Sequence, residues 1–121
     1  MRESIVSFIG EITAISPGLR AVRERTIVYW LPDEPPITTA LADLGDAVVD
    51  GFESAGVAVN QAIFLAIEKA MKSGDVELST AVATGMIEAI VGRAFRVGTW
   101  DRVRPLLGNA SAQHADAWAG R

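Results

Sequence analysis

The chain has 121 residues, half of them hydrophobic, a length and composition typical of one globular domain with its own core. It contains no cysteine, which excludes a disulfide framework, a thiolate zinc site and a cysteine nucleophile. The formal net charge of −4 disfavours nucleic-acid binding, because a phosphate backbone would repel most of the surface.

The first half of the chain predicts three helices. Over residues 4–15, apolar residues recur at the three- and four-residue spacing of one helix face. A second helix is predicted over residues 19–30, although the β-branched run within it also fits an extended segment. A proline-rich loop follows at residues 31–36, since prolines cannot continue a helix. A third helix is predicted over residues 37–54, with Gly56 as its stop signal.

Four more helices are predicted in the second half. Gly74 suits the left-handed conformation after a helix, and Asp75 can cap the helix that follows. Gly98 should break the chain, with Thr99 as the next N-cap. Gly85 lies within a predicted helix, where a close approach of a neighbouring helix would explain it. These helices are expected over residues 58–73, 76–93, 100–107 and 111–118.

The fold expected from these elements is all-α, a single domain over residues 1–121. The connections are short, so neighbouring helices should pack roughly antiparallel in a bundle of about five to seven helices. The pair Ile-Glu recurs at residues 67–68 and 87–88, each time in mid-helix and with an apolar residue three positions later. This repetition is compatible with HEAT-like helical hairpins, although two copies do not establish a repeat.

An acidic stripe is the most distinctive surface feature of the sequence. From Thr26 to Glu68 there are seven acidic residues and no lysine or arginine. Asp43, Asp46, Asp50 and Glu53 are spaced for one helix face, and Thr39 extends the row. Three readings are open: a solvated helix face, a patch for a basic protein partner, and oxygen ligands for a divalent cation. One helix alone would not complete a metal site, and no second acidic helix is evident.

Aromatic residues give a second set of candidates. Trp30 is assigned to the core, and Trp118 is expected to pack back onto the fold. Trp100 opens a short helix beside charged residues, so we expect it to be partly exposed and available to a partner. The candidate partner-binding residues are Asp33, Glu34, Thr39, Asp43, Asp46, Asp50, Glu53 and Trp100.

No pattern of catalytic or cofactor-binding residues is evident, so we expect a protein that is not an enzyme and needs no cofactor. His114 is read as a surface histidine, since it has no partner motif for acid–base work. Phosphate-loop and dinucleotide glycine patterns are absent from the sequence. The arginines at positions 93, 96, 102 and 104 could bind an anion, or they could pair with the acidic helix, either internally or in a neighbouring copy.

The segments Ala62–Glu77 and Ala81–Glu88 carry a recognisable arrangement: an apolar residue with Glu, then Gly-Asp, then a small-residue helix ending in Gly-Met-Ile-Glu. This arrangement resembles small helical bacterial proteins, several of which look like immunity proteins of polymorphic toxin systems. The resemblance implies a protein that binds a cognate toxin and blocks its active site or substrate cleft. It supplies no catalytic residue. The acidic stripe adds the expectation that this toxin has a basic surface.

The alternative is a helical adaptor or self-associating scaffold. In that case the acidic stripe would meet the arginine-rich C-terminal region of another copy, which makes a homo-oligomer. For location, residues 1–18 lack the continuous apolar segment of a signal peptide, and no uninterrupted apolar run approaches the roughly 18 residues that span a bilayer. We therefore expect a cytoplasmic protein that contacts neither membrane nor nucleic acid.

Overall fold

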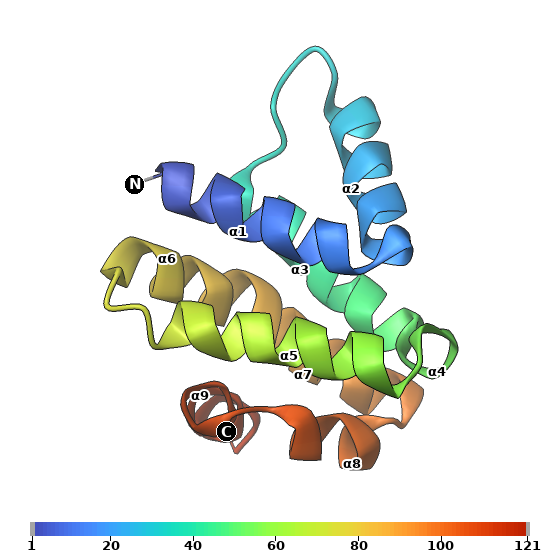
Figure 1. Cartoon of the computed structure of the whole chain (residues 1–121), viewed down its shortest axis with the longest axis vertical. Coiled ribbons are helices and arrows are strands. Elements are labelled where there is room, and N and C mark those ends of the chain that lie inside the picture. The colour runs from blue at the N-terminus through green and yellow to red at the C-terminus, as the bar shows by residue number, and fades with distance from the viewer. Residues whose placement is uncertain (1, 121) are drawn as a thin grey trace.

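The computed structural model describes residues 2–120, and every regular element among them is helical (Figure 1). The predicted all-α bundle is therefore confirmed. In chain order the elements are α1 (Arg2–Ile15), α2 (Pro17–Trp30), α3 (Ile37–Asp50), α4 (Phe52–Ala55), α5 (Val57–Met71), α6 (Val76–Ala81), the π-helical turn η1 (Val82–Ile87), α7 (Glu88–Val97), α8 (Trp100–Val103), the 3-10 turn η2 (Arg104–Leu106) and α9 (Asn109–Ala119).

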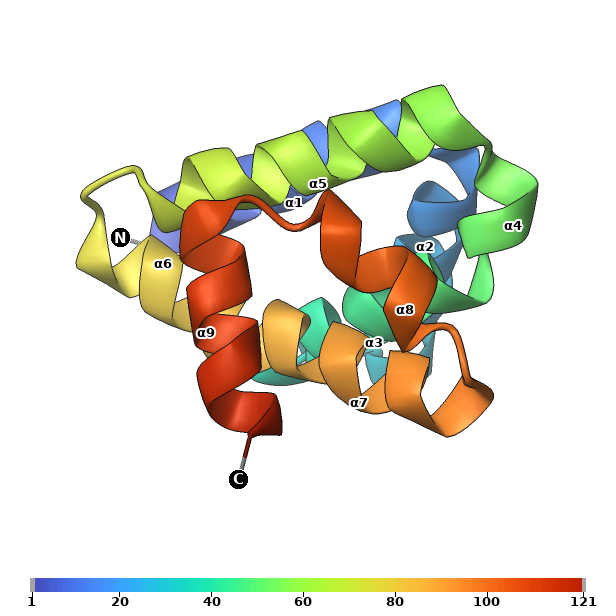
Figure 2. The ribbon, with the colours of Figure 1, turned by 90° about the horizontal axis from the view of Figure 1, so that it is seen from below.

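One continuous helix, formed by α6, η1 and α7, runs through the centre of the bundle (Figure 2). This central helix packs most extensively against α3, and also against α1, α5 and α9. Because it has neighbours on several sides, it is apolar over more than one face. It extends to Val97, beyond the predicted end at residue 93, and Gly98 ends it with a φ of 78°. Its most deeply buried side chains are Val82, Met86, Ile87, Ile90, Val91 and Ala94.

The central helix and α3 approach each other closely because each contributes a glycine to the contact. A Cβ atom at Gly45 would lie 2.7 Å from the carbonyl oxygen of Met86, and one at Gly85 would lie 2.9 Å from the Cβ of Leu41. In a close-packed interior a larger residue at either position would force the helices apart. The role predicted for Gly85 is thus confirmed, and Gly45 is its unpredicted counterpart.

The prediction of one helix over residues 37–54 is wrong at its C-terminal end. Helix α3 ends at Asp50, and the short helix α4 follows after Gly51. Gly51 leaves the helical conformation at φ −93° and ψ 7°, which the low helix propensity of glycine favours. Gly56 ends α4 at a φ of 87°, in the role predicted for it.

The turn between α5 and α6 forms as predicted. Gly74 has a φ of 82°, and a carboxylate oxygen of Asp75 accepts a hydrogen bond of 3.0 Å from the amide of Leu78. Thr99 stands at the N-cap position of α8 but makes no capping bond. Its hydroxyl oxygen is buried and has no hydrogen-bond partner among the described residues.

Two glutamates hold α9 against the bundle. The carboxylate of Glu68 accepts hydrogen bonds from the amides of Ala110 and Ser111 at 2.9 Å and from the Ser111 hydroxyl at 2.8 Å. Glu88 lies 3.0 Å from the half-buried ring of His114, so the prediction of a plain surface histidine is wrong. The glutamates of the two Ile-Glu pairs therefore both contact α9. This shared role does not require a structural repeat.

Candidate functional site

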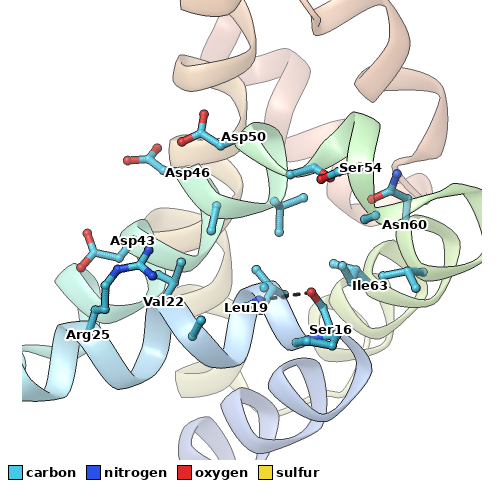
Figure 3. A pocket seen from close by; sticks show the side chains of 18 of the residues that line it. Ser16, Leu19, Val22, Arg25, Asp43, Asp46, Asp50, Ser54, Asn60 and Ile63 are labelled. Atoms are coloured by element: carbon cyan, nitrogen blue, oxygen red, sulfur yellow. Dashed lines mark hydrogen bonds between the residues drawn. The ribbon is translucent and has the colours of Figure 1, made fainter.

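Three aspartates, Asp43, Asp46 and Asp50, lie in a row along α3 (Figure 3). Thr39 is half-buried on the same helix, one turn before Asp43. Glu53 lies in α4, beyond the break that follows α3. The predicted stripe of four acids on one helix is therefore interrupted, and only its three aspartates share a helix.

The C-terminal end of this acidic row is neutralised within the chain. Arg93 donates two hydrogen bonds to the carboxylate of Asp50, at 2.8 and 3.3 Å, and Arg102 forms an ion pair with Glu53. Both pairs are largely exposed, so each contributes little to stability, but each removes an unmatched negative charge from the surface. The internal pairing left open by the sequence is therefore adopted by Arg93 and Arg102, whereas Arg104 pairs with Asp116 of α9.

The other two aspartates are not joined to a cation by an ion pair in the described part of the chain. Within the described residues neither Asp43 nor Asp46 forms an ion pair, and Asp43 accepts a hydrogen bond of 3.0 Å from the hydroxyl of Thr26. Burial raises the pKa of Asp46, although Arg93 and Arg96 act in the opposite direction. A cation brought by a partner would stabilise the charged form of a carboxylate that is half-buried and has no ion pair.

A groove of about 810 Å³ runs between α2 and α3 and reaches α5 (Figure 3). Asp43 and Asp46 line it from α3, while the half-buried Val22, Ala47 and Val59 contribute apolar surface. It continues into a second hollow of about 730 Å³ beside the C-terminal half of α2. The two hollows share Ala21, Arg25, Thr26 and Asp43, so together they form one trough along α2.

Asn60 lines the groove from α5 and carries a buried acceptor without a partner. Its side chain is 5% exposed, and its Nδ2 donates a hydrogen bond of 2.8 Å to the carbonyl oxygen of Phe52. Its Oδ1 is buried and makes no hydrogen bond within the described residues. Sequence reasoning missed Asn60. The available signal was a polar residue three positions before Ile63, on the apolar side of its helix.

The C-terminal end of α2 carries a patch of exposed apolar side chains. Tyr29 is 83% exposed, Val28 65% and Leu31 62%. We call these three residues the α2 tip. Trp30 is half-exposed and meets Tyr29 edge-on at a centroid distance of 6.0 Å, so its assignment to the core is wrong. The physical reason is that α2 and the following loop project from the rest of the bundle (Figure 1).

The remaining predicted residues lie on either side of this region. Asp33 and Glu34 are exposed in the loop that directly follows the α2 tip. Trp100 is half-buried, stacks on Phe95 at a centroid distance of 5.2 Å and packs against the core. It opens α8 at the opposite end of the molecule from the α2 tip (Figure 1). The predicted partner-binding residues therefore do not form a single surface.

Carboxylate and amide oxygens line the groove beside apolar side chains, together with one cation, Arg25. Such a site suits a group that brings a positive charge or N–H donors together with an apolar stem. Within residues 2–120, no group of three or more acidic or histidine side chains is placed to hold a metal ion.

No family model, curated protein or solved structure matches this chain. The resemblance to immunity proteins and the HEAT-like alternative therefore stay predictions.

The central helix Val76–Val97 is, among the described residues, the one helix long and apolar enough to cross a membrane by length and composition. Half of its most apolar window is buried inside the bundle, and a core helix of a soluble protein meets the same criteria. The cytoplasmic location stays a prediction as well.

Proposed function

We propose that this protein is an immunity protein, which binds a bacterial toxin with a basic surface and covers its active site or substrate cleft. The exposed apolar α2 tip carries the proposal that the protein acts by binding another protein. The resemblance of residues 62–88 supports the toxin as the class of partner. In this proposal the protein works in the cytoplasm by occlusion alone, without catalysis or a cofactor.

The α2 tip has the composition of a binding anchor. Exposed apolar side chains that cluster at one place are typical of interaction sites, whereas isolated ones are ordinary. Tyrosine is enriched among the residues that dominate binding energy, because a large ring is ordered at low entropic cost. Tyr29 and Val28 extend from a regular helix and need little ordering of the backbone when a partner binds.

The acidic groove beside the tip supports a basic partner. Asp43 and Asp46 form no ion pair within the described residues, and Asp33 follows the tip in the loop. The net charge of −4 would accelerate encounter with a toxin whose cleft is positive, as a cleft for nucleic acid or nucleotides would be. The toxin would thus be steered by charge and held by the apolar anchors.

The test expresses this protein together with each protein encoded beside its gene. We expect one neighbour to stop growth when expressed alone, growth to resume when this protein is present, and the two to purify as a complex. The double variant Val28→Ser, Tyr29→Ser should weaken that complex about 100-fold, since each anchor contributes a large share of binding. The matched control is Leu65→Ser, which removes an equally exposed apolar side chain from α5.

Different outcomes would contradict the proposed function and the role of the α2 tip. If no growth-inhibiting neighbour is rescued or bound by the wild-type protein, the proposed function is wrong. If the double variant and the Leu65→Ser control bind alike, the α2 tip is not the anchor.

A helical adaptor or self-associating scaffold is the second candidate, because the same exposed tip could dock on another copy. An apolar contact of this kind persists or strengthens as salt is raised, whereas a contact between charged surfaces weakens. Sedimentation of the purified protein at low and high salt tests this candidate. A monomer under both conditions would contradict it.

A further inference from the structure

We infer that the groove between α2 and α3 receives an arginine or lysine side chain from an extended, basic and partly apolar segment of the protein partner. The inference rests on the proposed function, in which the partner is a protein. It deepens that function by assigning the contact to the groove rather than to the exposed row of acids as a whole.

The charges of the groove are unbalanced toward the negative. Asp50 is already matched by Arg93, whereas Asp43 and Asp46 form no ion pair within the described residues. One cation, Arg25, also lines the groove and reaches toward Asp43 from α2 (Figure 3). Arg93 and Arg96 also act on the charge of Asp46, although within the described residues neither forms an ion pair with it. Two carboxylates without an ion pair therefore line the groove beside one cation, Arg25, which favours a further positive charge from a partner.

Asn60 supplies an independent indication of a ligand. Its amide is held by the hydrogen bond to Phe52, so Oδ1 cannot turn toward another partner without breaking that bond. Buried acceptors without a donor are rare in folded proteins and call for an explanation, which a bound donor would provide. Figure 3 places the oxygen of Asn60 on the groove side of the amide. A lysine ammonium or arginine guanidinium brings several donors, and the backbone of the same segment brings more.

The shape of the groove favours a polypeptide segment over a compact small molecule. The two hollows form one trough along α2, and a helix of 14 residues is about 21 Å long. An extended segment of roughly six residues spans that length. The half-buried side chains of Val22, Ala47 and Val59 would contact the alkyl stem of a basic side chain, while the head reaches the aspartates.

The test uses a blocked hexapeptide of alternating leucine and arginine, titrated into the full chain labelled with ¹⁵N. We expect shifts of the backbone amides that line the groove and of the Asn60 side-chain amide, with binding that weakens as salt is raised. The matched hexapeptide of leucine and glutamate should not bind. Asp46→Asn should weaken the arginine peptide about tenfold, since a charge-assisted bond is lost. The control Asp101→Asn, which removes an exposed acid from α8, should leave its affinity unchanged.

A second variant places a cation in the groove without disturbing any hydrogen bond. Ala21 is exposed and lines both hollows, so Ala21→Lys should occupy the site and weaken the arginine peptide at least tenfold. Ala14→Lys, at an exposed position of α1, is its control. Equal binding of the acidic peptide, equal effects of each variant and its control, or shifts confined to another face would each overturn the inference.

The failure of this inference is distinguishable from failure of the proposed function. If Asp46→Asn and Ala21→Lys neutralise the toxin as well as the wild-type protein does, the groove inference is wrong while the function stands. If the arginine peptide binds in the groove but no neighbouring toxin is neutralised, the groove stands and the function is wrong.

Discussion

The central helix and α2 show how differently two helices of one small domain can be used. The central helix is surrounded by α1, α3, α5 and α9, and several of its side chains have no exposed surface at all. Helix α2 packs against α1 and α3, and within it only Leu19 and Thr26 are buried. Since one helix supplies the core and the other leaves its apolar end exposed, the exposed helix is where binding is expected.

The contrast follows from the two sequences. The central helix carries small and aliphatic residues on most of its faces, and Glu88 is the one charged residue in its middle. Helix α2 places arginines at positions 20, 23 and 25 among its apolar residues, so it offers no continuous stripe for the core. Its apolar residues then gather at one end, where the bundle no longer covers them. Exposure of the α2 tip is thus a consequence of patterning rather than of a missing element.

Truncating one side chain in each helix should give the largest contrast in stability. Ile90 is 0% exposed in the central helix, and Ile90→Ala should lower the free energy of unfolding by about 2–5 kcal/mol through lost burial and a cavity. Val28→Ala in the α2 tip should change it by less than about 0.5 kcal/mol. Urea denaturation followed by circular dichroism measures both. Similar losses in the two variants would mean that the α2 tip is covered in solution, for instance by a second copy.

Two glycine substitutions test the close contact on which the central helix depends. Gly45→Ala places a methyl group against the Met86 carbonyl and Ala89, so we expect a loss of about 1–3 kcal/mol from overpacking. Gly10→Ala is the matched change in α1, where nothing lies within 4 Å of the added Cβ. It should stabilise the protein by about 0.5–1 kcal/mol, because alanine favours the helix more than glycine. Thermal unfolding of the two variants gives the comparison, and a stabilising Gly45→Ala would show that the helices are further apart than described.

The sequence predicts the helices themselves well and their partners poorly, for a physical reason. Apolar periodicity and glycine or aspartate at helix ends are local signals, and they place most of the elements correctly. The break at Gly51 was missed because the apolar pattern continues through it. The pairing of Asp50 with Arg93 joins residues 43 positions apart, and periodicity within one helix holds no information about such a contact. The core assignment of Trp30 failed in the same way, since no local signal reports that α2 leaves the bundle.

Helix α9 is intermediate between these two helices, because it lies at the periphery but is held by polar contacts. Removing one of these contacts should give the smallest change in the free energy of unfolding. Burial raises the pKa of Glu68, but the hydrogen bonds from Ala110 and Ser111 outweigh it and lower the pKa overall. The stabilisation by Glu68 is therefore fully present above the ordinary glutamate pKa of 4.5 and is lost as the pH falls through the lower folded value.

At neutral pH, Glu68→Gln should lower the free energy of unfolding by about 1–2 kcal/mol, because its amide cannot accept all three hydrogen bonds. That deficit should shrink as the pH is lowered below 4.5, where the wild-type glutamate also loses its charge. Glu24→Gln, an exposed acid of α2, should cost close to nothing at any pH. Urea titrations at several pH values measure both variants, and a Glu68→Gln deficit that persisted unchanged into acid would show that the charge of Glu68 does not hold α9.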